Sequence, residues 1–130
     1  MDTSLQLTVA KLELKQMEVI EKLSEKHNDY VIRVIQSSVT DKFVMLNGDW
    51  ELITGFKEID CVGMGWEKII PMPEVPKVFK HISDIKKHDN FDCFTTKLII
   101  RDKKVVSVNW KGKYFPEING LVFIGRVKRS

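Results

Sequence analysis

The sequence has few of the residues that build metal centres, disulfide scaffolds or membrane spans. Its 130 residues include two cysteines, Cys61 and Cys93, and three histidines. Two separated cysteines make neither a zinc ligand set nor a haem-attachment motif, so we expect free thiols, a reducing cytoplasm and no metal. No apolar run approaches the roughly 20 residues that a membrane-spanning helix needs, and the N-terminus lacks the pattern of a secretory signal.

Glycine and proline are also scarce, with seven and four residues. This scarcity excludes collagen-like chains, low-complexity repeats and long disordered stretches. Hydrophobic residues make up 43% of the chain and charged residues 30%, as in an ordinary globular protein. A chain of this length corresponds to about one domain, and it can bury a core without disulfides.

No catalytic pattern is present. The chain has no Ser-His-Asp set and no glycine-rich loop of the kind that cradles phosphates, and its histidines are scattered. We therefore expect that the protein is not an enzyme.

The net charge of +3 is unevenly distributed. From Lys97 to Ser130 the chain has nine basic residues and two acidic ones. A basic segment can follow nucleic-acid phosphates. However, no nucleic-acid-binding motif accompanies it, and alternate Lys and Arg residues along strands usually form a solvated sheet face. We expect no nucleic-acid partner.

Residues 4–28 show the spacing of an amphipathic helix with two apolar sides. A helix that is apolar on two sides needs two partners, which could be its own domain and the same helix of a second chain. Packing of both sides inside one monomer, or inside a longer native assembly, is the alternative. One side is a second stripe of Leu7, Ala10, Leu14 and Met17. The other is a heptad stripe, through which we predict a homodimer, formed by Leu5, Val9, Leu12, Val19 and Leu23.

The remaining chain predicts two strands, several short helices, one longer helix and three more strands. The segment 30–36 is rich in β-branched residues, which favours a strand, although a continuing helix is the alternative. Asn47, Gly48 and Asp49 are expected to end the second strand and to cap the helix that follows. The predicted strands are 30–36, 43–46, 91–100, 105–114 and 121–127, and the predicted helices are 50–54, 57–61, 66–70 and 74–88.

This order predicts an α+β fold, with a five-stranded antiparallel sheet and its helices inserted in the middle. The amphipathic helix precedes it. We divide the chain into a dimerisation and signalling helix, residues 1–28, and a globular domain, residues 29–130.

Several segments resemble PAS domains, in the right order and at the right spacing. The run Asn47–Phe56 closely resembles the PAS pattern N-x-x-F/W-x-x-L/I-T-G-Y/F, and Trp66–Pro71 resembles the W-x-x-I/L-x-P stretch that follows it. Asp102–Gly112 and Asn119–Gly125 are similar to the last segments of the family. The resemblance covers about residues 30–128, and it implies a PAS fold in which the aromatic Phe56 turns inward.

The resemblance also implies a small-ligand or cofactor pocket in the core, although plain core packing is the more ordinary role for each candidate residue. Asn47, Thr96 or Asn109 could orient a ligand there, although turn and helix capping is the more ordinary role for Asn47. The candidate pocket residues are Phe56, Trp66, Ile69, Phe79, Ile82, Leu98, Ile100, Val108, Trp110 and Ile124.

The sequence departs from the family at three places. The segment from Gly63 to Trp66 lacks the reactive cysteine of light-sensing flavin domains. Haem-binding members carry a histidine on the long helix, but His81 falls on the flank of that helix, so we expect a rim histidine. The chain ends in Lys128-Arg129-Ser130, where many PAS-linked kinases have Asp-Ile-Thr. The identity of any cofactor therefore stays open.

Two functions fit this reading. The first is a cytoplasmic sensory or regulatory domain that binds a small ligand in its core and relays the change through dimer contacts to a kinase, cyclase or regulator partner. The second is an interaction module whose core is filled by its own aromatic side chains. The three tryptophans and seven phenylalanines are enough to fill a small core.

Overall fold

The computed structural model of the chain describes residues 29–88 and 91–128. The predicted helix and dimer stripe within residues 1–28 lie outside this range, so both stay predictions. Among the described residues, no helix is long and apolar enough to cross a membrane.

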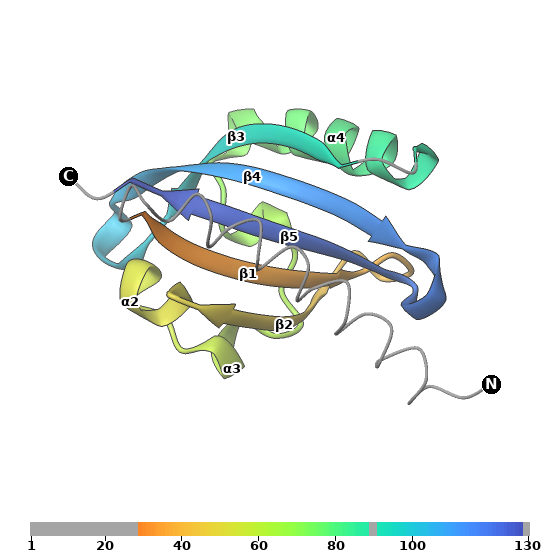
Figure 1. Cartoon of the computed structure of the whole chain (residues 1–130). Coiled ribbons are helices and arrows are strands. Elements are labelled where there is room, and N and C mark those ends of the chain that lie inside the picture. The colour runs from red at the N-terminus through yellow and green to blue at the C-terminus, as the bar shows by residue number, and fades with distance from the viewer. Residues whose placement is uncertain (1–28, 89–90, 129–130) are drawn as a thin grey trace.

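Five antiparallel strands form one sheet in the order β2-β1-β5-β4-β3 (Figure 1). The predicted α+β fold with a five-stranded antiparallel sheet is confirmed. The first and last strands of the domain pair at the centre of the sheet, and β5 is almost wholly buried. The strands are β1 (Tyr30–Ser37), β2 (Phe43–Gly48), β3 (Asp92–Ile99), β4 (Val105–Phe115) and β5 (Gly120–Val127).

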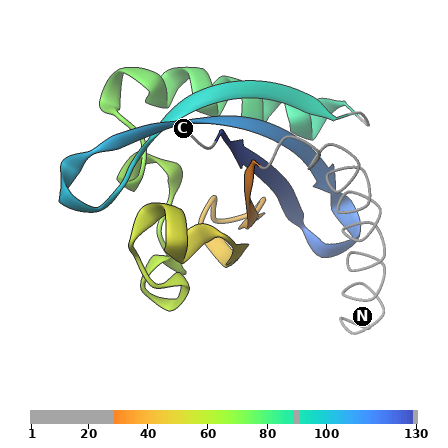
Figure 2. The same cartoon turned by 60° about the vertical axis from the view of Figure 1, so that its left-hand side comes forward.

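Short helical segments connect β2 to the longer helix α4 and, through it, to β3. Figures 1 and 2 show α4 along β3 and β4, and α2 and α3 beside β1 and β2. The segments are α2 (Trp50–Thr54), α3 (Glu58–Cys61), η2 (Trp66–Lys68), η3 (Met72–Glu74) and α4 (Val75–Lys87), and two further single turns, η4 (Arg101–Lys103) and η5 (Pro116–Ile118), precede β4 and β5.

The helix α4 forms because its apolar residues recur at helical spacing. Val78, Ile82 and Ile85 are all buried against the sheet. A proline in its first turn costs no hydrogen bond, and Lys86 and Lys87 in the last turn complement the helix dipole. The helix therefore covers β3 and β4 with one apolar stripe.

Side-chain alternation along the strands separates two apolar clusters. On β1, Ile32 and Val34 belong to the large cluster under the helices, whereas Val31 belongs to a smaller one on the opposite face. On β5, Phe123 faces the large cluster and Ile124 the small one. The core therefore lies between the sheet and its helices, and we call it the inner core.

The predicted side-chain cap of α2 is wrong. The strand β2 ends at Gly48, within the expected segment 47–49, but the side chain of Asp49 does not cap α2. Instead, Asp49 Oδ2 accepts a hydrogen bond from the backbone N–H of Val31 at 2.9 Å, and the backbone N–H of Asp49 donates to the Val31 carbonyl at 2.8 Å. Asp49 thus links the start of α2 to β1, because its carboxylate accepts a hydrogen bond from a strand N–H and not from an N–H of the helix.

Phe56 does not turn inward. Gly55 ends α2 in the left-handed conformation, with φ of 76°, as glycine allows. The buried side of this turn is taken by Thr54, whose hydroxyl donates to the Trp50 carbonyl at 2.7 Å and accepts from the Phe56 N–H at 3.1 Å. The Phe56 ring is left 37% exposed.

Candidate functional site

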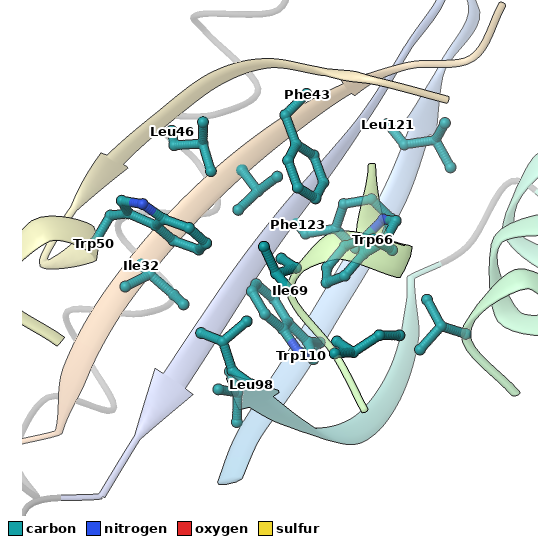
Figure 3. Packing of buried hydrophobic residues seen from close by; sticks show 14 of the residues in the cluster. Ile32, Phe43, Leu46, Trp50, Trp66, Ile69, Leu98, Trp110, Leu121 and Phe123 are labelled. Carbon is teal, nitrogen blue, oxygen red and sulfur yellow. The ribbon is translucent and has the colours of Figure 1, made fainter. Parts of the chain in front are cut away.

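Trp66 lies at the centre of the inner core, and it is fully buried. Three aromatic rings meet its indole edge-on (Figure 3): Phe43 from β2, Trp110 from β4 and Phe123 from β5, with ring centroids 5.3, 5.1 and 5.2 Å away. These distances and near-perpendicular planes are the favoured geometry of aromatic pairs. The rings of the protein itself therefore fill the middle of the core.

The Trp66 indole also makes one polar contact. Its N–H donates to Gln36 Oε1 at 2.6 Å, and Gln36 is a fully buried glutamine on β1. The other end of the same amide donates from Nε2 to Asp41 Oδ1 at 3.2 Å. Because an indole N–H can only donate and a carboxylate can only accept, the two partners fix the orientation of the Gln36 amide.

Asp41 carries this connection to the longer helix. Lys86 on α4 places its Nζ 3.3 Å from Asp41 Oδ1 and 3.2 Å from the carbonyl oxygen of Ser38. Asp41 lies in the turn between β1 and β2, at a positive φ of 57°. A polar chain of Trp66, Gln36, Asp41 and Lys86 therefore links the centre of the core to a surface turn and to α4.

A second buried pair holds the neighbouring tryptophan. The Trp110 N–H donates to the hydroxyl of Thr96 at 2.8 Å, across the β3–β4 pair, and Thr96 is 1% exposed. Thr96 is thus one of the three predicted polar groups that does face the core. Asn109 lies on the outer face, where its Oδ1 accepts from the Thr95 hydroxyl, and Asn47 pairs in register with Arg33 on that same outer face.

Two strand glycines make room for the aromatic rings. A Cβ atom at Gly125 would lie 2.7 Å from Trp110 Cζ3, and one at Gly112 would lie 2.7 Å from the Phe123 ring. Such contacts are too short for any side chain at these positions. The aromatic cluster therefore depends on the absence of side chains on β4 and β5.

The structure brings most of the predicted pocket residues together in the inner core. Phe79 packs against this cluster from the side, and Ile100 is half-buried outside it. Phe56 is exposed, and Ile124 belongs to the small cluster on the other face because it alternates with Phe123. The residues that do share the inner core are Trp66, Ile69, Ile82, Leu98, Val108 and Trp110.

Sequence reasoning missed Gln36, Phe43 and Phe123. Alternation along β1 could have found Gln36, since it follows Ile32 and Val34 at a spacing of two. The same alternation on β5 points to Phe123 rather than Ile124. No sequence signal shows that Gln36 meets Trp66, which is thirty residues away in the chain.

His81 occupies the flank of α4, as its position in the helix predicted. Its Nδ1 lies 2.8 Å from Asp92 Oδ2, and its ring stacks on Phe94 with centroids 4.6 Å apart. A surface groove of about 460 Å³ between α4 and the start of β3 is lined by His81, Asp84, Ile85, His88, Phe91 and Asp92. Among the described residues, no group of three or more His, Cys, Asp or Glu side chains could hold a metal ion.

Both cysteines are free, and they differ in environment. Cys61 at the end of α3 is buried, and Cys93 on β3 is exposed. Burial raises the pKa of the Cys61 thiol above its ordinary value of 9.0, which the Trp50 indole N–H partly offsets and the Asp60 carboxylate reinforces. Cys61 is therefore a neutral thiol at physiological pH.

Comparison with known proteins identifies the fold. No family model and no curated protein matches the chain. Among solved structures, a tryptophan-to-alanine variant of the PAS-B domain of Drosophila melanogaster Cycle, with bound glycerol, superposes with a TM-score of 0.62 at 10% identity, over 75% of this chain and 97% of that one.

Two bacterial structures are similar to the same extent. The PAS domain of the Cronobacter turicensis RpfR quorum-sensing receptor, in complex with BDSF, gives a TM-score of 0.63 at 13% identity, over 79% of this chain and 95% of that one. A blue-light activated histidine kinase of Erythrobacter litoralis gives 0.64 at 13% identity, over 80% of this chain and 35% of the kinase. The chain therefore has the PAS fold that its motifs predicted.

Proposed function

We propose that this chain is a sensory domain of a signal-transduction protein, and that it takes a small ligand in its inner core. The observation that supports this most directly is the aromatic surround of Trp66 with one buried, oriented amide beside it. Aromatic walls with a few placed polar groups are typical of small-molecule sites. Structural neighbours with this fold include a quorum-sensing receptor domain and a light-activated kinase.

The polar chain from Trp66 to Lys86 supports a route by which core occupancy changes the surface. A ligand that alters the Trp66–Gln36 contact alters the partner of Asp41, and with it the attachment of α4 to the β1–β2 turn. Such coupling requires that the ligand bind the two arrangements with different affinity. We propose that the relay ends in a homodimer contact through Leu5, Val9, Leu12, Val19 and Leu23.

The remaining parts of the proposal concern the partner. A kinase, a cyclase or another regulator would receive the signal in the cytoplasm, and the chain itself would catalyse no reaction. The kinase neighbour has this fold as one part of a longer chain, which supports an effector outside the sensor domain.

A ligand-free interaction module is the second candidate. It is favoured by the same ring cluster, since Phe43, Trp66, Trp110 and Phe123 already pack at the distances expected of a filled core. In this case the domain would act only by dimerising or docking a partner.

One sample distinguishes the two candidates. Freshly purified full-length chain is examined by absorbance spectroscopy and then by native mass spectrometry. A dimer with added mass supports the sensor, and the spectrum gives the class of the bound molecule. A dimer of bare polypeptide, with no rise in melting temperature across a panel of small molecules, favours the interaction module. A monomer at micromolar concentration would contradict the relay through the dimer and would leave partner docking as the only role of the interaction module.

A further inference from the structure

Trp66 and the side chains around it lie on different kinds of backbone: its neighbours lie on rigid strands, and Trp66 lies on a short, irregular segment. These neighbours are Gln36, Phe43, Trp110 and Phe123, all on strands of the sheet, and we call these four residues the aromatic cage. Trp66 itself begins the three-residue turn η2. The strands would keep the cage in place even if the segment that contains Trp66 moved.

The segment that contains Trp66 is a connection of single turns. Gly63, at a φ of 89°, and Gly65 precede Trp66, and Pro71 follows η2. Backbone hydrogen bonds to Phe43 on β2, one from Ile99 on β3 to Ile69, and those within the turn hold this segment, but it does not pair along the length of any strand. Segments of this kind open at lower free energy than central strands.

The polar end of the cage can take only one kind of partner. Gln36 Nε2 donates to Asp41 Oδ1, and Asp41 in turn is held by Lys86. Gln36 Oε1 is therefore left facing the core as a hydrogen-bond acceptor. A ring in this position must present a donor, because a buried ring atom with a lone pair would face the amide oxygen without a hydrogen bond.

We propose that the aromatic cage is a ligand site that the Trp66 side chain closes, and that its ligand is a planar heteroaromatic ring of about the size of indole with one ring N–H donor. This rests on the proposed function, since it names the ligand class of the inner core. Ligand and Trp66 compete for the same rings and the same amide oxygen, so the open fraction of the protein sets the apparent affinity.

The first test empties the cage in the full-length chain. In Trp66→Gly, isothermal titration calorimetry compares indole with benzothiophene, a ring of the same shape without an N–H. The matched control adds Gln36→Leu, which removes the acceptor and keeps the size. We expect saturable indole binding, and an indole-to-benzothiophene affinity ratio about tenfold higher in Trp66→Gly than in the double variant. An unchanged ratio would overturn the proposal.

The second test uses the unaltered protein, so it does not depend on how well the variants fold. The chain has three tryptophans, and with nitrogen-15 in their rings each gives one indole N–H signal, which substitution by phenylalanine assigns. At millimolar indole we expect the Trp66 N–H to lose its protection against hydrogen exchange while that of buried Trp50 keeps it. Retained protection at Trp66 means that the indole is not displaced, and the proposal fails.

This inference and the sensor proposal fail separately. A co-purified ligand that has no ring N–H donor would support the sensor proposal and overturn the heteroaromatic one. A cage that selects indole in a chain that never dimerises would support the ligand class and contradict the relay through the dimer.

Discussion

Gln36 is the residue on which the polar part of the core depends. Its amide satisfies the Trp66 N–H at one end and reaches the Asp41 carboxylate at the other, and no part of it is exposed. A buried amide with both ends paired strengthens a core, whereas a buried donor left alone weakens it. Gln36 thus joins an apolar cluster to a surface ion pair.

Substitution Gln36→Leu should therefore destabilise the domain although it adds an apolar side chain. The Trp66 N–H would lose its acceptor inside the core, which costs about 1–3 kcal/mol. Urea unfolding of the full-length chain measures the change. Thr95→Val is the matched control, because it removes the exposed Thr95–Asn109 hydrogen bond, and it should change stability by less than about 0.5 kcal/mol. Equal effects of the two variants would contradict the role given to Gln36.

The two cysteines should react at different rates. An exposed thiol is open to reagents, whereas a buried thiol with a raised pKa offers little thiolate. With a chromogenic disulfide reagent at neutral pH, we expect one fast thiol in native protein and a second only on unfolding. Cys93→Ser should abolish the fast phase and Cys61→Ser should leave it intact. A fast phase that survives Cys93→Ser would show that Cys61 is accessible.

The raised pKa of Cys61 also predicts a loss of stability in alkali. Folding raises the pKa of this thiol above 9.0, so the folded state holds the proton more tightly than the unfolded state. The resulting stabilisation is complete below about pH 9 and declines as the pH rises through the folded-state value. Urea midpoints at pH 8 and pH 10 should differ less in Cys61→Ala than in wild type. An identical pH dependence in the two proteins would contradict the assigned shift.

At the scale of elements, the sheet and the long helix could be predicted from the sequence because their residues alternate or recur at a regular period. The predicted helix 50–54 coincides with α2, and the long helix and all five strands appear within a few residues of their expected ends. The predicted helix 66–70 is only the turn η2. Residues in such single turns are placed by their tertiary contacts, which no local period encodes.

The candidate site could be predicted only in part for the same reason. Trp110 and Val108, both predicted pocket residues, do lie on the inner face of β4, where side chains alternate along the strand. On β5, the predicted pocket residue Ile124 lies in the small cluster, and its neighbour Phe123 lies in the inner core. The exposure of Phe56 depends on a hydrogen bond to Thr54 that arises only once Gly55 has reversed the chain.

The two strand glycines predict an element-scale effect. Gly125→Ala would place a methyl group 2.7 Å from Trp110 and 2.7 Å from Val108 Cγ1 in the packed core. Overpacking of this kind costs about 1–3 kcal/mol, although alanine is otherwise well tolerated in place of glycine. Thermal unfolding measures the loss. Ser107→Ala, at an exposed position on β4, is the control and should leave the melting temperature unchanged; a neutral Gly125→Ala would mean that the rings can move aside.

At the scale of the whole molecule, the two faces of the sheet differ in their apolar packing and in their charge. The helices cover the inner core, whereas Val31, Phe115, Val122 and Ile124 form the small cluster on the outer face. Beside that cluster, Lys111 and Lys113 lie over the Phe91 ring at 5.9 and 5.5 Å. Lys111 and Lys113 thus lie along a solvated sheet face, as the alternation of basic residues along the strands predicted. Both side chains pack on an aromatic ring of the same chain.

The proposed dimer makes the last prediction, which concerns the assembled protein. Because a dimer is stabilised by mass action, the melting temperature of the full-length chain should rise with protein concentration. Leu12→Glu places a charge in the predicted heptad stripe and should yield a monomer by sedimentation velocity, with a melting temperature independent of concentration. Ser4→Glu adds the same charge outside both apolar stripes, and it should leave the dimer intact. If both variants stay dimeric, the contact lies elsewhere, and the relay from Gln36 and Lys86 would have to reach another surface.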